Sequence, residues 1–388
     1  MAQDTAEIAA RATRAGRLGI DTEFMGEGRY RPLLCLVQVA VPTGDGSTSD
    51  VDVLDPLTDG GIDHGPLADV LADPAVEIVM HAGRQDCTLL RRVWETRLTN
   101  IFDTQVAAGF AGLRAQLGYE PLVGELLGVR LRKSASFTRW DVRPLSEEQV
   151  SYAREDVLHL LQAADALQDR LGDMGRLDWA REECRFLEEL SDERDPEVLF
   201  ERLPRIGGLD PGMRAVAYEL VLWREDTARE GDRPASSVLQ DAALVEIAKR
   251  RPASPERLGQ IRGLHEGILR RRGAQIVAAV ERGRAREPIP SERERPAGTE
   301  PEDAPLITLA ESLVRTRALE RELAYELLAA RADLQRIVTA FRDGKPEPDV
   351  RTLQGWRREV VGAELLELLA GDRTLRVGAG RRIEISGP

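Results

Sequence analysis

The 388-residue sequence has few cysteines, histidines and aromatic residues, and it has no long apolar segment. Its three cysteines are odd in number and widely spaced, with no Cys-x-x-Cys pair, so we expect reduced thiols in the core rather than disulfides or a zinc site. No apolar run approaches the roughly 20 residues that a membrane helix needs, and the first residues do not resemble a secretory signal. These absences predict a cytoplasmic protein without a membrane partner.

The charge of the chain is negative but unevenly distributed. The formal net charge of −13 argues against a protein that coats itself broadly in nucleic acid. Residues 207–287, however, contain 15 Lys and Arg against 12 Asp and Glu. This basic segment is compatible with a local nucleic-acid contact, although arginine-rich helices are also common as plain solvated surfaces.

The length and a hydrophobic content of 42% predict two or three globular domains. In the first half, short β-rich runs and helical patterns alternate after an initial group of strands. This order indicates an α/β domain with a mixed central sheet. The predicted strands cover residues 18–24, 33–41, 51–54 and 76–80, and the predicted helices cover 65–71, 104–110 and the segment from 86.

Two acids, Asp21 and Glu23, lie one residue apart in the first predicted strand. Side chains at i and i+2 of a strand point to the same face, so the two carboxylates should stand side by side. Like charges that close repel each other, and burial adds to the cost. A hard divalent cation with oxygen ligands would resolve the conflict. The alternative is a solvated edge strand with two exposed acids.

Asp86 and Asp103 each follow a predicted strand at the start of a helix. Both positions suit a helix cap or a first-turn acid, which helix N-termini favour without any further function. For Asp103 no functional partner is evident, so we predict a cap.

Tyr152 and Asp156 are four residues apart on a helix whose start is fixed by the capping box Ser146-Glu147-Glu148-Gln149. That spacing places the phenol and the carboxylate on one face, one turn apart. The alternative is a tyrosine at the rim of the core and a solvated aspartate.

Three sequence blocks join these residues into a known pattern. The blocks are Gly19-Ile20-Asp21-Thr22-Glu23-Phe24 with the run 30–38 behind it, His81-Ala82-Gly83-Arg84-Gln85-Asp86, and residues 140–146 leading into 152–156. In this order they resemble the tyrosine-bearing branch of the DEDD exonuclease superfamily, and within it the bacterial ribonuclease D family. The resemblance covers the whole first half and implies a ribonuclease H-like exonuclease domain with a mixed sheet.

The resemblance implies a two-metal reaction with Mg²⁺ or Mn²⁺ that releases nucleoside 5′-monophosphates from RNA 3′ ends. Asp21 would bridge both ions, and Glu23 and Asp156 would hold the ion next to the attacking water. Asp86 would hold the second ion through waters. Tyr152 would orient the attacking water, since a tyrosine pKa of about 10 makes it a poor base at neutral pH.

Four residues are candidate substrate contacts, to phosphate or by stacking on the terminal base: Phe24, His81, Lys133 and Arg143. His81 lies at a strand end, where satisfying backbone groups is the alternative role. The chain departs from the family at Arg139, which precedes Trp140 where an acid is common. That departure concerns substrate contact rather than catalysis.

The second half is predicted to be all helical. Residues 173–208 are expected to form a helical connector, 209–287 an HRDC domain, 288–304 a linker, and 305–388 a second HRDC-like domain. The HRDC resemblance rests on Trp223-Arg224, Asp232-Arg233-Pro234 and Leu264. The basic runs 249–251 and 270–272 are candidate phosphate contacts, or simply solvated surfaces.

The sequence therefore predicts a monomeric, metal-dependent 3′–5′ exoribonuclease that acts on RNA with a single-stranded 3′ end, such as tRNA precursors. One alternative is an exodeoxyribonuclease of the same superfamily. Another is a catalytically inactive RNA-binding scaffold that has kept the fold.

Overall fold

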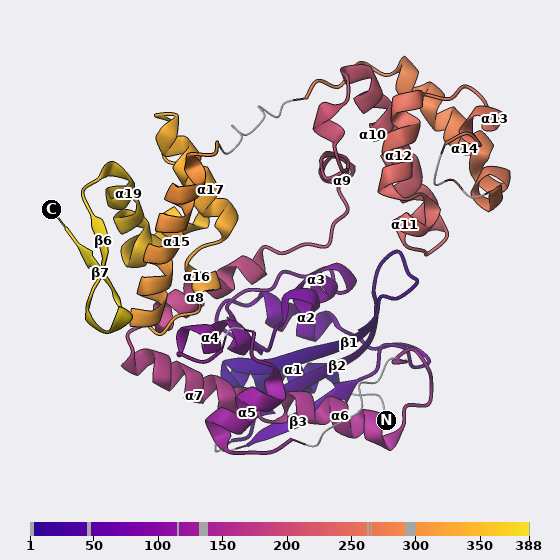
Figure 1. The fold of residues 1–388 in the computed structure, drawn as a ribbon. Helices are drawn as coiled ribbons and strands as arrows, with labels where there is room; N and C mark the ends of the chain where they lie inside the picture. Colours follow the sequence, from indigo (N-terminus) through magenta and orange to yellow (C-terminus); the bar gives the residue numbers. More distant parts are fainter. Residues whose placement is uncertain are drawn as a thin grey trace.

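The computed structural model describes residues 4–44, 48–114, 116–131, 139–261, 264, 266–291 and 300–387. An α/β domain carries two helical domains, one reached through α8 and α9 and the other formed by the C-terminal helices (Figure 1). Lys133 lies outside the described residues, so its predicted substrate contact has no structural counterpart here.

A five-stranded mixed sheet in the order β3-β2-β1-β4-β5 forms the centre of the α/β domain, as predicted. β1 is antiparallel to β2 and parallel to β4, so it lies in the middle. The strands are β1 (Arg17–Met25), β2 (Leu33–Pro42), β3 (Ser49–Leu54), β4 (Glu77–Met80) and β5 (Ile101–Asp103).

Helices cover both faces of this sheet. Ile20 and Val39 face one apolar cluster with α1 (Thr5–Ala15), α2 (Gly65–Ala72) and α3 (Arg84–Val93). Ala40 and Val79 face another, which includes side chains of the helices on the opposite side. Those helices are α4 (Thr104–Phe110), α5 (Tyr119–Leu127), α6 (Glu147–Leu158) and α7 (Leu160–Asp173).

The predicted connector divides between two units. Its first helix, α8 (Leu177–Glu188), covers the edge strand β5, where the backbone N–H of Ile101 donates to Glu188 at 3.2 Å. Its second helix, α9 (Pro196–Glu201), contacts α10 of the first helical domain. The connection between the domains is therefore shorter than the sequence suggested.

The first helical domain consists of η1 (Ile206–Gly208), α10 (Pro211–Glu230), α11 (Ala235–Val238), α12 (Asp241–Arg250), α13 (Pro255–Leu258) and α14 (Glu266–Ala285). The second contains α15 (Asp303–Glu320), α16 (Tyr325–Leu328), α17 (Arg331–Arg342), η2 (Arg351–Leu353), α18 (Gly355–Arg357), η3 (Arg358–Gly362) and α19 (Ala363–Ala370). Both domains thus contain a long helix, a one-turn helix and a medium helix in this order: α10, α11 and α12 in the first, and α15, α16 and α17 in the second. Among the described helices, none has the length and hydropathy needed to span a lipid bilayer.

The prediction that the second helical domain is all α is wrong at its end. An antiparallel hairpin, β6 (Thr374–Val377) and β7 (Ile383–Ser386), follows α19, with η4 (Ala379–Arg381) between its strands. Its short segments alternate apolar and polar residues, which is typical of strands, and Leu375 and Ile385 pack against the core.

The second helical domain shares one continuous apolar core with the α/β domain. Trp356, which is 3% exposed, stacks on Trp179 of α8 with ring centroids 5.4 Å apart and meets Phe110 of α4 edge-on at 4.9 Å. Two buried aromatic rings and the half-buried ring of Trp179 make this a firm attachment.

We expect Trp356→Ala to lower the free energy of unfolding by about 3–5 kcal/mol, because it removes a buried aromatic side chain and leaves a cavity. Urea unfolding followed by far-ultraviolet circular dichroism measures the loss. Phe341→Ala is the control, since Phe341 is 45% exposed. An equal effect of both substitutions would contradict the shared core.

Candidate active site

Three carboxylates converge where α6 crosses the middle of the sheet. Asp21 and Glu23 of β1 point to the face that α6 covers, and Asp156 of α6 meets them. One carboxylate oxygen from each residue lies within 4.8 Å of the other two. Asp156 is therefore within a ligand's reach of Asp21, as the metal-site prediction requires.

These acids line a pocket of about 180 Å³ together with His81, Tyr119, Tyr152 and Leu160. The phenol of Tyr152 hydrogen-bonds the carboxylate of Asp156 one turn further along α6. Tyr152 and Asp156 therefore lie on one face of α6, as predicted.

The approach of α6 to β1 depends on local sequence. Ser146 caps α6: its hydroxyl accepts from the N–H of Gln149 at 3.1 Å, while the Gln149 side chain accepts from the N–H of Ser146. Gly19 leaves room at the start of α7, because a Cβ there would lie 3.2 Å from Cδ2 of Leu160. A larger residue would push this helix pair away from the acids.

Asp86 reaches the same region from the other side of β1. It lies in the first turn of α3, only 7% exposed, and its carboxylate accepts a hydrogen bond from the hydroxyl of Thr22. It is not one of the three acids that approach within 4.8 Å. Its charge nevertheless raises the pKa of both Asp21 and Glu23, which places it close to the cluster.

Burial raises the pKa of every acid in this group, and repulsion from the other acids of the group adds to it for Asp21 and Glu23. Burial is the larger cause for Asp21, whose pKa lies well above its ordinary value, and Asp86, Asp156 and Glu23 add to it. The pKa of Glu23 rises to about 8, that of Asp156 to about 7 and that of Asp86 to about 6, each chiefly through burial. Burial also raises the pKa of Tyr152, which makes its phenol a still poorer base.

His81 contacts the side chain of Thr104 and also the backbone of Leu117. Its Nδ1 lies 2.9 Å from the hydroxyl of Thr104, and that hydroxyl donates to the carbonyl of Met80. The hydroxyl has only one proton, so it must accept from Nδ1, which leaves the other ring nitrogen without a proton. Burial lowers the pKa of His81, so the ring is neutral near pH 7.

Asp103 does more than the predicted cap. Its carboxylate accepts from Gln105 and Val106 at the start of α4, and also from the N–H groups of Ala82 and Gly83, at 3.2 and 2.8 Å. Ala82 has a φ of 55°, a conformation that costs energy for alanine. The buried carboxylate of Asp103 therefore holds the turn between His81 and Asp86.

Arg143 is engaged inside the protein. Its guanidinium makes two 2.6 Å contacts with the carboxylate of Asp55 and donates to the carbonyls of Cys35, Trp140 and Val142. All five N–H donors are used. In this structure Arg143 ties the segment before α6 to β2 and β3, which leaves no free donor for the predicted phosphate contact.

Phe24 lies on the opposite face of β1 from the acids. It packs against the cluster that contains α1 and α3 and is not among the described residues that line the pocket. The structure therefore gives no support to a stacking contact with the terminal base from this side chain.

Sequence reasoning missed Thr22, Tyr119 and Gln38. Tyr119 lines the pocket, and its ring lies 5.5 Å from that of His81. Gln38 pairs with Asp21 across the strands, is fully buried, and has no hydrogen-bond partner for its amide among the described residues. Thr22 and Gln38 lie inside the sequence blocks that carry the family resemblance. At Tyr119 the only signal in the sequence is that tyrosine is rare in this chain.

The donor set fits hard divalent cations. All candidate ligand atoms are carboxylate oxygens, which Mg²⁺ and Mn²⁺ prefer. Raised pKa values show that the acids lack compensating positive charge within the protein. Asp21, Glu23 and Asp156 would hold a cation directly, and Asp86 lies next to this group.

Comparisons with known proteins agree with this geometry. Residues 2–172 match the family model of a 3′-5′ exonuclease and residues 213–280 match that of the HRDC domain. Proteins named Ribonuclease D from Gluconacetobacter diazotrophicus and Granulibacter bethesdensis are each 38% identical, covering 98% and 99% of this chain and 94% of the relative. The crystal structure of Escherichia coli RNase D, described as an exoribonuclease involved in structured RNA processing, is 29% identical, with a TM-score of 0.81 over 95% of this chain and 97% of its own.

The raised pKa values predict how stability depends on pH without divalent cations. Unfolded carboxyls lose their protons near pH 4, whereas Glu23 and Asp156 keep theirs in the folded protein up to about pH 8 and 7. The folded state then binds more protons between these pH values, so stability falls as pH rises from about 4 to 8.

Asp21→Asn removes one repelling charge, so in EDTA we expect it to melt at a higher temperature than the parent protein at pH 8, with the difference vanishing near pH 4. Mg²⁺ should raise the melting temperature of the parent more than that of the variant. Differential scanning fluorimetry measures both effects. The control is Asp169→Asn on the exposed side of α7, and the prediction fails if this variant gains as much.

Proposed function

The chain belongs to the ribonuclease D family and is a 3′–5′ exoribonuclease, and we propose that the acidic pocket between β1 and α6 is its catalytic centre. The family implies dependence on divalent metal ions. The observation that carries the assignment is the approach of the Asp21, Glu23 and Asp156 carboxylates within 4.8 Å in a pocket that Tyr152 also lines.

Two bound Mg²⁺ or Mn²⁺ ions would lower the pKa of the attacking water and neutralise the departing 3′ oxygen. Asp21 would be the ligand shared by the two ions, since its carboxylate lies within 4.8 Å of those of Glu23 and Asp156 and the charge of Asp86 also acts on it. Asp86 would contribute to the second ion through water.

Tyr152 orients the attacking water. Its phenol hydrogen-bonds Asp156, and burial raises its pKa, so it keeps its proton at neutral pH. His81 lies on the pocket wall, and its buried Nε2 has no hydrogen-bond partner among the described residues. This nitrogen would accept a hydrogen bond from the sugar of the terminal nucleotide.

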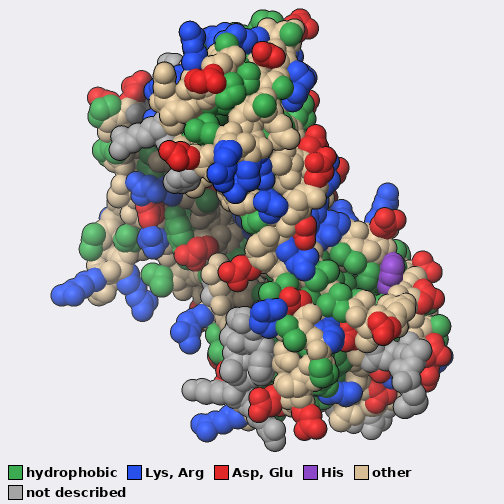
Figure 2. All heavy atoms as spheres, turned by 90° about the vertical axis from the view of Figure 1, so that its right-hand side faces the viewer, with side chains coloured by type: hydrophobic (Ala, Val, Ile, Leu, Met, Phe, Trp, Pro, Cys, Tyr) green, Lys and Arg blue, Asp and Glu red, His purple; other side chains and the backbone are tan. Residues whose placement is uncertain are grey.

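The arginines of the HRDC domain contact the RNA backbone upstream of the 3′ end. Among the described residues, no carboxylate forms an ion pair with Arg233, Arg270 or Arg271. Burial lowers the pKa of Arg272, and the positive charges of Arg233 and Arg271 lower it further. By contrast, Arg250 pairs with Glu246 at 2.6 Å. Figure 2 shows Lys and Arg side chains in several clusters on the upper, helical part of the molecule.

The run 270–272 is thus the better phosphate contact of the two basic runs, because like-charged guanidiniums without acidic partners attract an anion. The single-stranded 3′ ends of tRNA precursors, a monomeric state and a cytoplasmic location stay predictions.

We expect Asp21→Asn to abolish release of nucleoside 5′-monophosphates from 5′-labelled single-stranded RNA, and excess EDTA to abolish it for the parent protein. Tyr152→Phe should lower kcat about 10²-fold with little change in KM, since it removes only the hydroxyl that places the water. A single-stranded DNA of the same sequence, digested in parallel, tests the exodeoxyribonuclease alternative. Full activity of Asp21→Asn would refute the site, and an inactive parent protein would favour the scaffold.

Replacing Arg233 and Arg271 with Gln should raise KM for a long single-stranded RNA and reduce the dependence of log affinity on log salt by about 1.4, because each phosphate contact on a single strand contributes about 0.7. Fluorescence anisotropy with an uncleaved RNA in Ca²⁺ measures the slope. Arg250→Gln with Arg315→Gln removes the same charge from residues that are ion-paired with Glu246 and Glu311. A slope changed equally by both pairs would show only a general charge effect.

A further inference from the structure

The two helical domains are attached to the α/β domain by different kinds of contact. The second shares an apolar core with it, as described above. The core of the HRDC domain is a separate cluster built on α10, α12 and α14. Among the described hydrophobic residues of the first 172, Tyr30 is the only one that packs against this cluster.

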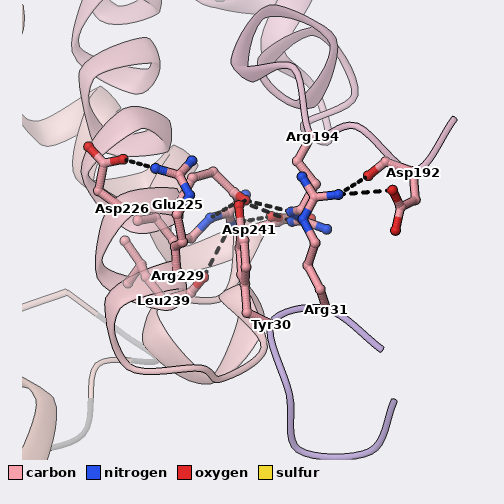
Figure 3. Close-up of polar contacts among 10 residues, drawn as sticks. Tyr30, Arg31, Asp192, Arg194, Glu225, Asp226, Arg229, Leu239 and Asp241 are labelled. Carbon is pink, nitrogen blue, oxygen red and sulfur yellow. Dashed lines mark hydrogen bonds and ion pairs between the residues drawn. The ribbon is translucent and has the colours of Figure 1, made fainter. Parts of the chain in front are cut away.

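Tyr30 lies in the loop between β1 and β2 and reaches a buried acid of the HRDC domain. Its hydroxyl donates to Oε2 of Glu225 on α10 at 3.1 Å, and Glu225 is only 1% exposed. Arg194, just before α9, donates to both carboxylate oxygens of Glu225, at 2.7 and 3.1 Å. Figure 3 shows Tyr30 and Arg194 meeting at this carboxylate.

The ring of Tyr30 also lies among arginines from three segments. The guanidinium carbons of Arg31, Arg194 and Arg229 are 5.8, 5.2 and 5.9 Å from its centroid. Each distance is within the range of a cation–π contact. One aromatic side chain thereby joins the α/β domain, the connector and the HRDC domain.

Ion pairs on both sides of Tyr30 hold the same loop. Arg29 pairs with Asp232 of the HRDC domain at 2.8 Å, and Asp232 also accepts from the N–H of Tyr30. On the connector, Asp192 pairs with Arg31 at 3.0 Å and with Arg92 of α3 at 2.7 Å. Apart from the packing of the Tyr30 ring, these contacts are polar, in contrast to the apolar attachment of the second helical domain.

The position of this loop connects it to both functional regions. It follows directly from β1, the strand that carries Asp21 and Glu23. Its partner Asp232 is next in sequence to Arg233, a member of the unpaired basic group on the HRDC domain. Holding the loop against α10 thus fixes the distance between the acidic pocket and those arginines.

We propose that Tyr30 is a positioning residue, a clasp that sets the orientation of the HRDC domain relative to the acidic pocket so that one RNA strand contacts both. The inference rests on the proposed function of the pocket and of the HRDC arginines. A short RNA fills only the pocket, whereas a long RNA also needs the HRDC domain in place. Loss of the clasp should therefore affect long RNA selectively.

The test compares Tyr30→Ala with the parent protein on a three-nucleotide RNA and on a single-stranded RNA of about twenty nucleotides. Loss of the cation–π contacts and the hydrogen bond should lower kcat/KM for the long RNA about tenfold or more and change that for the short RNA less than twofold. Small-angle X-ray scattering of the same samples should show a larger radius of gyration for the variant.

Tyr325→Ala is the matched control, because Tyr325 also lies beneath an arginine, Arg315 at 4.6 Å, but in the second helical domain. It should leave the ratio of the two kcat/KM values unchanged. If Tyr30→Ala does not fold, Asp192→Asn opens the connector side of the clasp, where two arginines lose their shared carboxylate, and both measurements are made on it.

An equal loss on both RNAs would overturn the proposal, because it would show that the loop acts on the catalytic strand alone. Unchanged scattering and an unchanged ratio would overturn it as well. If the parent protein cleaves neither RNA, the proposed function fails, while scattering still decides whether Tyr30 holds the HRDC domain.

Discussion

Repulsion between carboxylates in a largely buried pocket is the constraint on which the rest of this structure depends. Asp21, Glu23 and Asp156 lie within 4.8 Å of one another, with Asp86 close by, and burial raises the pKa of each. Such an arrangement costs stability unless cations enter, so the surrounding fold has to impose it. The capping box at Ser146, the space left by Gly19, the buried carboxylate of Asp103 and the fully engaged guanidinium of Arg143 all serve that purpose.

Local periodicity was enough to predict the parts of the site that lie on one element. The period of a strand placed Asp21 and Glu23 on one face, and the period of a helix did the same for Tyr152 and Asp156. The strand period also puts Phe24 on the opposite face, which makes a stacking role for it inconsistent with the pattern that identified the acids. The hairpin β6–β7 was missed because its four-residue strands alternate too briefly to stand out from a helical background.

What the sequence could not show depends on tertiary contacts. Whether an arginine is free for phosphate is decided by its partners, and Arg143 meets Asp55, 88 residues away, whereas Arg271 meets no carboxylate among the described residues. The pocket wall at Tyr119 comes from a helix that carries no recognisable motif. Tertiary contacts also divide the predicted connector, because α8 packs on β5, the edge strand of the α/β sheet. A sequence does not mark which strand will lie at the edge of a sheet.

The acidic character of the pocket also explains why two attachments of different chemistry are useful. An RNA strand is a polyanion and must approach a chain with a net charge of −13. In the proposed reaction, cations offset the acids at the scissile phosphate, and the arginines of the HRDC domain offset the phosphates upstream. These two sources of positive charge can act on the same RNA strand only when the distance between them is fixed.

An apolar core fixes the second helical domain permanently. The ion pairs and the single ring at Tyr30 instead hold the HRDC domain with contacts that weaken as salt rises. The affinity for long RNA is thus tied to the same electrostatics that assemble the site.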